Sequence, residues 1–299
     1  MIKTHILILV FVFICKITVY GESLQHPDSA TIYQLKQSGD SILRGSSDSV
    51  RTLYNQQFYS KMDSILKEPG SFTFSFDSVK TLAVLVSPDK RLRIYNWILP
   101  LQRGNLFQYH GFIQTLDKKT KKITTYPLTE KKWATDSAEL LKLDAPHWYG
   151  ALYYKILHHK YNKKDVYTLL GWHGKDVQST RKVIDCITVT PTTIQFGAPV
   201  FKTGGKAKMR LIFEYNAQAT MSLKAEEDNR IVFDHLSPSD TRPEAKGMFS
   251  LYGPDMSYDA LEYEKGVWSL KKNIQPRNSR SESKKPVPLE KKLRITHSR

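Results

Sequence analysis

The chain has 299 residues, of which 45 are Lys or Arg and 29 are Asp or Glu, so its formal net charge is +16 at pH 7. Only two residues are Cys, which excludes a small scaffold held by several disulfides, and a body of this length can bury a core without such crosslinks. The charge indicates a solvating or anion-attracting surface and argues against one concentrated nucleic-acid groove.

The first 21 residues have the pattern of a secretory signal peptide. Lys3 precedes an unbroken apolar run over residues 6–14, and Gly21 supplies the small residue expected before a cleavage site. A membrane-spanning helix needs roughly 20 apolar residues, so the run favours a cleaved leader over an anchor. We therefore expect an exported protein, periplasmic or associated with the cell surface, which export keeps away from nucleic acid.

The two cysteines have different expected fates. A lipid on Cys15 is disfavoured, because Ile14 precedes it where a lipidation signal has a small residue. Without that lipid, membrane contact would be peripheral. Cys186 lies in the apolar stretch 183–189 and would be the one thiol left after cleavage. We expect it to be buried and inert, so folding must depend on a core without disulfides.

Residues 22–70 carry two helical signals. The weaker covers residues 31–43, with Gly39 as an expected breaker. The stronger begins after Ser47 or Asp48, which are good N-caps, and ends at the Glu-Pro-Gly sequence 68–70. Its apolar residues recur at spacings of three and four and form one stripe: Val50, Leu53, Tyr54, Phe58, Met62, Ile65 and Leu66. We expect this stripe to pack the helix against the domain that follows.

Residues 71–272 are predicted to form an antiparallel β domain. The hydrophobic period changes to two at Phe72, Phe74 and Phe76, which indicates a strand. The runs 81–86 and 91–99 flank a Ser-Pro-Asp-Lys turn and predict a hairpin. Further hairpins are expected where short strands flank turns: 155–158 with 166–172, 220–224 with 231–234 across the turn 226–229, and 258–263 with 267–270. A strictly alternating strand at 209–215 leads to the second of these hairpins.

These hairpins predict a mainly β fold, a single antiparallel hairpin-rich domain that is a sandwich or an open sheet and is preceded by the amphipathic helix. A propeller-like array is the second choice, because a blade takes roughly 40–45 residues and this body would supply only about four or five. Residues 136–143 could form a short crossover helix. Residues 273–299, rich in Lys, Arg, Ser and Pro, are predicted to be a disordered basic tail, with an electrostatic tether as the functional alternative.

Well-known catalytic and metal-binding motifs are absent from the sequence. It contains no His-Glu-x-x-His, Gly-x-Ser-x-Gly or Cys-x-x-Cys pattern. We therefore expect neither a cofactor nor a metal site.

Histidines give the one hint of an enzyme. His173 and the pair Asp234 and His235 each end a predicted strand, where loops assemble active sites. If these ends were neighbours, His173 could act as a base with Asp234 as its orienting carboxylate, and His235 is a further candidate. No nucleophile is specified, and a solvent-exposed histidine beside a turn is the commoner arrangement.

Aromatic residues give a richer signal for binding. Tyr95, Trp97, Trp148 and Trp172 lie in the predicted hairpins, among lysines and arginines. Aromatic faces beside cationic side chains are good platforms for carbohydrate or peptide. The alternative is that these rings pack across strands in the core.

Several segments of the β domain resemble a family of uncharacterised exported proteins from Bacteroidetes-type bacteria. The resemblance lies in the Ser-Pro-Asp-Lys turn with Arg-Ile-Tyr-Asn-Trp at 93–97, and in the segments 148–154, 167–172, 231–236 and 252–255. It covers roughly residues 50–272 and implies export and a shared β domain. It implies no catalytic residue.

The sequence thus predicts a noncatalytic envelope protein that binds an envelope protein or an anionic glycan through an aromatic β surface. The alternative is a periplasmic hydrolase with a histidine and aspartate site.

Overall fold

The computed structural model describes residues 27–190 and 193–275, so the leader-like residues 1–21 and most of the predicted basic tail lie outside the described residues. Within that part, strands dominate and helices are few, which confirms the predicted mainly β fold. No helix among the described residues has the length and apolar content needed to cross a membrane.

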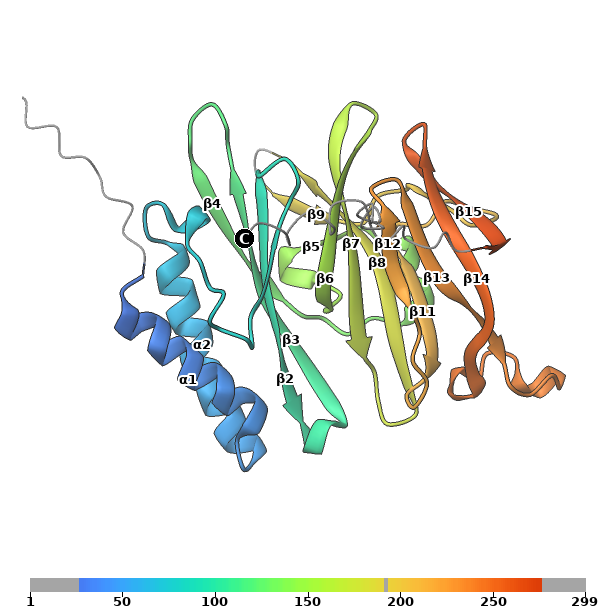
Figure 1. Cartoon of the computed structure of the whole chain (residues 1–299), viewed down its shortest axis with the longest axis horizontal. Coiled ribbons are helices and arrows are strands. Elements are labelled where there is room, and N and C mark those ends of the chain that lie inside the picture. Colours follow the sequence, from blue (N-terminus) through green and yellow to red (C-terminus); the bar gives the residue numbers. More distant parts are fainter. Residues whose placement is uncertain (1–26, 191–192, 276–299) are drawn as a thin grey trace, which may run out of the picture.

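The strands form three sheets, which are largely antiparallel (Figure 1). The first sheet has the order β1-β2-β3-β4, with bounds Ala83–Val86, Leu92–Leu101, Leu106–Leu116 and Ile123–Thr129. The second has the order β5-β9-β8-β7-β6, and β11 pairs with β8. Its strands are β5 (Leu143–Asp144), β6 (Leu152–Tyr161), β7 (Lys164–Gly174), β8 (Ser179–Val189), β9 (Ile194–Phe196) and β11 (Leu211–Asn216).

The third sheet has the order β10-β15-β14-β13-β12, in which only the two-residue pairing of β10 with β15 is parallel. Its bounds are β10 (Phe201–Lys202), β12 (Leu223–Glu227), β13 (Arg230–Pro238), β14 (Tyr252–Glu264) and β15 (Val267–Ile274). Three α-helices complete the described chain: α1 (Ser29–Arg44), α2 (Asp48–Leu66) and α3 (Thr135–Leu140).

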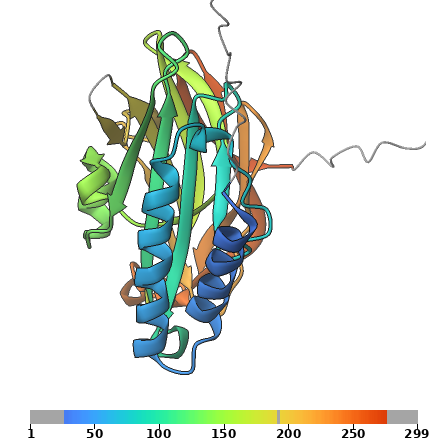
Figure 2. The same ribbon diagram turned by 90° about the vertical axis from the view of Figure 1, so that its left-hand side faces the viewer.

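Three hydrophobic cores join these elements into a stack of layers. The first core lies between the helices α1 and α2 and the first sheet, whose outer face the helices cover (Figure 2). The second lies between the first and second sheets, and the third between the second and third sheets. Adjacent residues of one strand therefore enter different cores: on β8, Val183 packs in the second core and Ile184 in the third.

The predicted helices are present, with one correction. The side chain of Ser47 accepts a hydrogen bond from the Val50 amide and caps α2, as expected. Gly39 does not break α1. It lies inside the helix, where a Cβ atom would come within 2.8 Å of the Thr81 hydroxyl, so glycine permits a close approach between α1 and the chain before β1.

The strand predicted at residues 71–77 is wrong. This segment forms a short 3-10 turn, Ser71–Thr73, followed by irregular chain. Phe74 and Phe76 are buried in the core under the helices. The phenylalanines alternate with polar residues because every second side chain enters that core. Such alternation does not require the segment to pair as a strand. The hairpin that follows is confirmed as β1 and β2.

A fully buried ion pair ties the second sheet to α3. Nε of Arg210 donates to a carboxylate oxygen of Asp185 on β8 at 3.1 Å, and both side chains are inaccessible to solvent. The guanidinium also donates to the carbonyls of Ala138 and Leu141, at the end of α3. The same Asp185 oxygen accepts a hydrogen bond from the Tyr153 hydroxyl. One buried cation thus satisfies carbonyls at the end of the crossover helix.

We expect Asp185→Ala to destabilise the fold by about 3–5 kcal/mol, because it leaves the Arg210 cation buried without its counter-ion. Guanidinium chloride unfolding measures the loss. The control is the double variant Asp185→Leu with Arg210→Met, which removes both charges at similar volume and should lose clearly less stability. Equal losses in the two variants would contradict an electrostatic role for the pair.

Candidate functional site

A groove runs between α2 and the first sheet and has two adjoining lobes. The first lobe, of about 470 Å³, lies at the start of α2, and the second, of about 570 Å³, lies farther along the same helix. Gln56 and Leu106 line both lobes and connect them. We refer to the two lobes together as the α2 groove.

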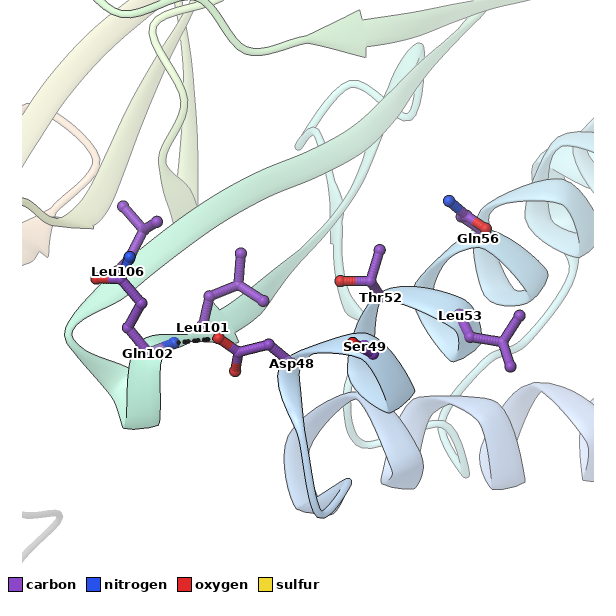
Figure 3. A pocket seen from close by; sticks show the side chains of 8 residues that line it. All are labelled: Asp48, Ser49, Thr52, Leu53, Gln56, Leu101, Gln102 and Leu106. Atoms are coloured by element: carbon purple, nitrogen blue, oxygen red, sulfur yellow. Dashed lines mark hydrogen bonds between the residues drawn. The ribbon is translucent and has the colours of Figure 1, made fainter.

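The first lobe is formed where α2 meets the turn between β2 and β3 (Figure 3). A carboxylate oxygen of Asp48 accepts a hydrogen bond of 2.9 Å from the backbone amide of Gln102 in that turn. Asp48 therefore holds the helix N-terminus against the sheet and borders the lobe. Leu53, which the sequence placed on the buried stripe, is instead half-exposed at this lobe.

A fixed hydrogen-bond chain forms the floor of the second lobe. The indole of Trp97, which can only donate, donates to the Asn55 Oδ1 at 2.8 Å. The Asn55 Nδ2 must then donate to the His110 Nε2, 3.1 Å away. His110 therefore accepts at Nε2 and is neutral. Burial lowers its pKa to about 4, which agrees with this arrangement.

Glu130 is the one carboxylate of the second lobe among the lining residues. It follows β4, and its Oε2 accepts a hydrogen bond of 2.9 Å from the Tyr109 backbone amide. Burial raises the pKa of Glu130, and the Tyr109 amide opposes that rise. The backbone of Gly150, at φ +80°, packs against the Glu130 side chain, where a Cβ atom would lie 2.8 Å from Cγ. Glycine is required there by both the contact and the dihedral angle.

His173 lies behind this lobe, enclosed by tyrosines. Its ring stacks on Tyr109 at a centroid distance of 4.8 Å and contacts Tyr149 at 5.1 Å. Its Nδ1 donates to the carbonyl of Gly150 at 2.7 Å. Burial lowers the pKa of His173 to about 4, although the hydrogen bond to the Gly150 carbonyl opposes this shift, so the ring is neutral. His173 is therefore a packed core histidine that lies next to the second lobe.

The structure does not join His173 to Asp234. His173 is on β7 in the second sheet, whereas Asp234 is on β13 in the third and accepts a hydrogen bond from the Ser222 amide. His235 pairs with a different carboxylate, Asp259, at 2.8 Å. The expected pairing therefore fails because the two strand ends belong to different sheets.

The aromatic platform also needs correction. Tyr95, Trp97 and Trp148 are buried in the cores and form no exposed face. The alternation of residues in the sequence predicted that the face of β2 carrying Tyr95 and Trp97 is open to solvent. In the structure, α1 and α2 cover that face. Trp172 alone of the four is partly exposed, and it packs edge-on against Phe107, which lines the α2 groove.

The residues that build the groove were mostly missed from the sequence. Asn55 is a polar break in the apolar stripe of α2, and it is buried. A buried amide needs partners, so its position could have signalled the Trp97 and His110 contacts. Glu130 gives no comparable signal. In the part of the chain that the structure describes, no group of three or more His, Cys, Asp or Glu side chains is placed to hold a metal ion.

No protein-family model matches the sequence, and no curated protein is significantly similar to it.

A pH titration tests the neutral state of His110. Because burial lowers its pKa from 6.5 to about 4, the unfolded chain takes up a proton first as the pH falls. Stability contributed by the neutral ring is therefore complete above pH 6.5 and declines toward pH 4, by at most about 3 kcal/mol. His110→Gln keeps an acceptor for Asn55 but does not titrate, so its stability should depend less on pH across this window.

Urea unfolding at a series of pH values measures the difference between the two proteins. His147→Gln removes an exposed histidine that contacts Asp144, and it controls for the loss of one histidine from the surface. An identical pH dependence in wild type and His110→Gln would show that His110 is not held neutral by the fold.

Proposed function

We propose that this protein is an exported envelope protein that binds a cell-envelope glycan without catalysis, and that the α2 groove holds the sugar. Export is supported by the leader-like residues 1–21 of the sequence. The observation that carries the binding proposal is the chemistry of the groove lining.

Neutral hydrogen-bonding groups dominate that lining. Its amide side chains are Asn55, Gln56, Gln102 and Gln108, and its hydroxyl groups include those of Ser49, Thr52, Tyr59, Ser60 and Thr129. Amides and hydroxyls both donate and accept, which matches the hydroxyl groups of a sugar. The rings of Tyr59 and Phe107 add apolar faces beside them. A concave site with a few polar groups around aromatic faces is typical of small-ligand binding.

His110 and Glu130, two of the titratable groups of the second lobe, are engaged within the protein, which supports binding over catalysis. The Nε2 of His110 accepts from Asn55, and an oxygen of Glu130 accepts from the Tyr109 amide. An acid–base mechanism needs a group that can take or give a proton at the substrate. His110 is neutral and has a low pKa, and the Glu130 carboxylate is bound to the backbone. This lining therefore favours ligand binding over acid–base catalysis.

The hydrolase alternative is best supported at His235. Its Nδ1 is oriented by Asp259, and the ring is partly exposed, as a general base requires. The hydroxyl nearest along the strand, Ser237, is hydrogen-bonded to Asp255, which weakens the case for a nucleophile. Neither His235 nor Asp259 lines the α2 groove. We therefore rank this alternative second.

Adjacent glutamines on α2 provide a matched test. Gln56 and Gln108 line the groove and are exposed, whereas Gln57 is exposed but lines a hollow on the other side of α2. We expect Gln56→Ala combined with Gln108→Ala to weaken glycan binding by about tenfold, since each neutral hydrogen bond contributes roughly 0.5–1.5 kcal/mol. Isothermal titration calorimetry with soluble peptidoglycan fragments from a lysozyme digest measures the affinity.

Gln57→Ala should bind the fragments as the wild type does. If the groove variant and the Gln57 variant bind equally well, or if the wild type gives no binding heat with these fragments, the groove is not a glycan site for this polymer.

A further inference from the structure

Four hairpin turns meet at one end of the molecule, at the top of Figure 1. We call residues 87–91, 117–122, 160–165 and 264–266 the lysine end. Nη1 of Arg91 contacts Asp165 at 3.3 Å and joins the first and third of these segments. The Leu116 amide donates to the Arg91 carbonyl, and the Tyr263 hydroxyl donates to the Lys160 carbonyl at 2.8 Å. The turns thus form one continuous surface built from all three sheets.

The lysine end is strongly cationic. It contains ten basic residues and four acidic ones, for a net charge of +6 in a chain of net charge +16. All nine of its lysines are exposed on the turns or at strand ends, namely Lys90, Lys118, Lys119, Lys121, Lys122, Lys160, Lys163, Lys164 and Lys265. The acidic turn between β12 and β13 borders this surface, where the carbonyl of Asp228 contacts His159.

Each of the four turns places a lysine in the left-handed backbone region. The φ angles are +56° at Lys90, +59° at Lys121, +64° at Lys163 and +50° at Lys265. Glycine and asparagine adopt this conformation at lower cost, and two-residue hairpin turns favour them strongly. In the two-residue turn 162–163, Lys163 occupies the position where glycine is preferred.

A cation that is kept at a strained position in four separate turns indicates that the charge is useful, because backbone strain persists where function retains it. The turn chemistry alone would select neutral residues. The repeated use of lysine therefore distinguishes this end from a surface whose charges serve only to keep the protein soluble.

A cleft of about 640 Å³ opens between the turns and is bordered by Arg91, Lys122 and Lys164. Arg91 donates to Asp165 through Nη1, while its shielded Nε has no acceptor among the described residues. The hydroxyl groups of Thr120, Thr124 and Thr190 line the same cleft. Asp117 and Asp165 also line the cleft, so its three cations leave a small positive excess. Together with the hydroxyl donors, that excess can receive the phosphate of a lipid headgroup.

We propose that the lysine end binds an anionic lipid surface. Nine of its ten cations are lysines, and lysine is a flexible point charge without the fixed fork that arginine offers to one bidentate partner. The charges are spread over four turns from three sheets. This arrangement suits the many phosphate groups of a lipid surface better than one polymer chain bound in a groove. Adsorption of this kind is electrostatic and weakens as the salt concentration rises. Each basic residue contributes a roughly equal share of the binding free energy. It does not depend on the glycan proposed for the α2 groove.

The test replaces Lys90, Lys121, Lys163 and Lys265 together by Asn and measures co-sedimentation of the purified protein with vesicles. The vesicles contain about 30% phosphatidylglycerol in phosphatidylcholine, with pure phosphatidylcholine as the neutral reference. We expect the wild type to bind only the anionic vesicles, and to detach as NaCl rises from about 0.05 M to about 0.5 M. The variant should bind at least roughly tenfold more weakly, yet melt at the same or a higher temperature because the strain is relieved.

The matched control replaces four exposed lysines away from these turns, Lys36, Lys80, Lys142 and Lys246, by Gln. It removes the same charge and should retain most of the vesicle binding. Equal losses in the two variants would mean that net charge alone causes adsorption and would overturn the proposal. So would tighter binding to heparin than to the anionic vesicles at equal salt, because that result assigns the surface to an acidic polymer.

Discussion

The first and second sheets are covered on both faces, and this constraint determines where polar chemistry can occur. Helices α1 and α2 cover one face of the first sheet, and the second sheet covers the other. The third sheet covers the far face of the second. Strands buried on both sides leave few positions open to solvent, as six consecutive buried residues of β2 illustrate. The two polar residues among the six, Arg93 and Asn96, donate to backbone carbonyls. On these two sheets, binding groups are therefore confined to the turns at the strand ends and to the seam beside α2.

Several buried polar groups hold the layers together. Asp185 and Arg210 connect the second sheet to the crossover through α3, and Gln114 on β3 donates to the carbonyl of Leu66 at the end of α2. Arg93 similarly donates to the carbonyls of Phe72 and Phe74. Irregular chain between the layers carries carbonyls that no strand can satisfy, so cations and amides from the sheets satisfy them.

The local rules predicted the elements but not their neighbours. Cap chemistry at Ser47 and turn chemistry at residues 87–90 are local, and both α2 and the first hairpin were found from them. The burial of Trp97 depends on α2 lying over β2, and the separation of His173 from Asp234 depends on which sheet each strand joins. Period-two alternation indicates two faces of a strand but not which of them another layer covers. The burial of Cys186 was predicted correctly because residues 183–189 are rich in apolar side chains.

The two proposed surfaces are compatible because they lie toward opposite ends of the first sheet. Strand β2 runs from the lysine end to the turn that contacts Asp48, and its 10 residues span roughly 30 Å. A molecule adsorbed through the lysine end would hold the first lobe of the α2 groove at about that distance from the lipid headgroups. This exceeds the Debye length of about 8 Å at physiological ionic strength. The first lobe would therefore meet its ligand beyond the field of the surface, where neutral amides and hydroxyls are a suitable lining.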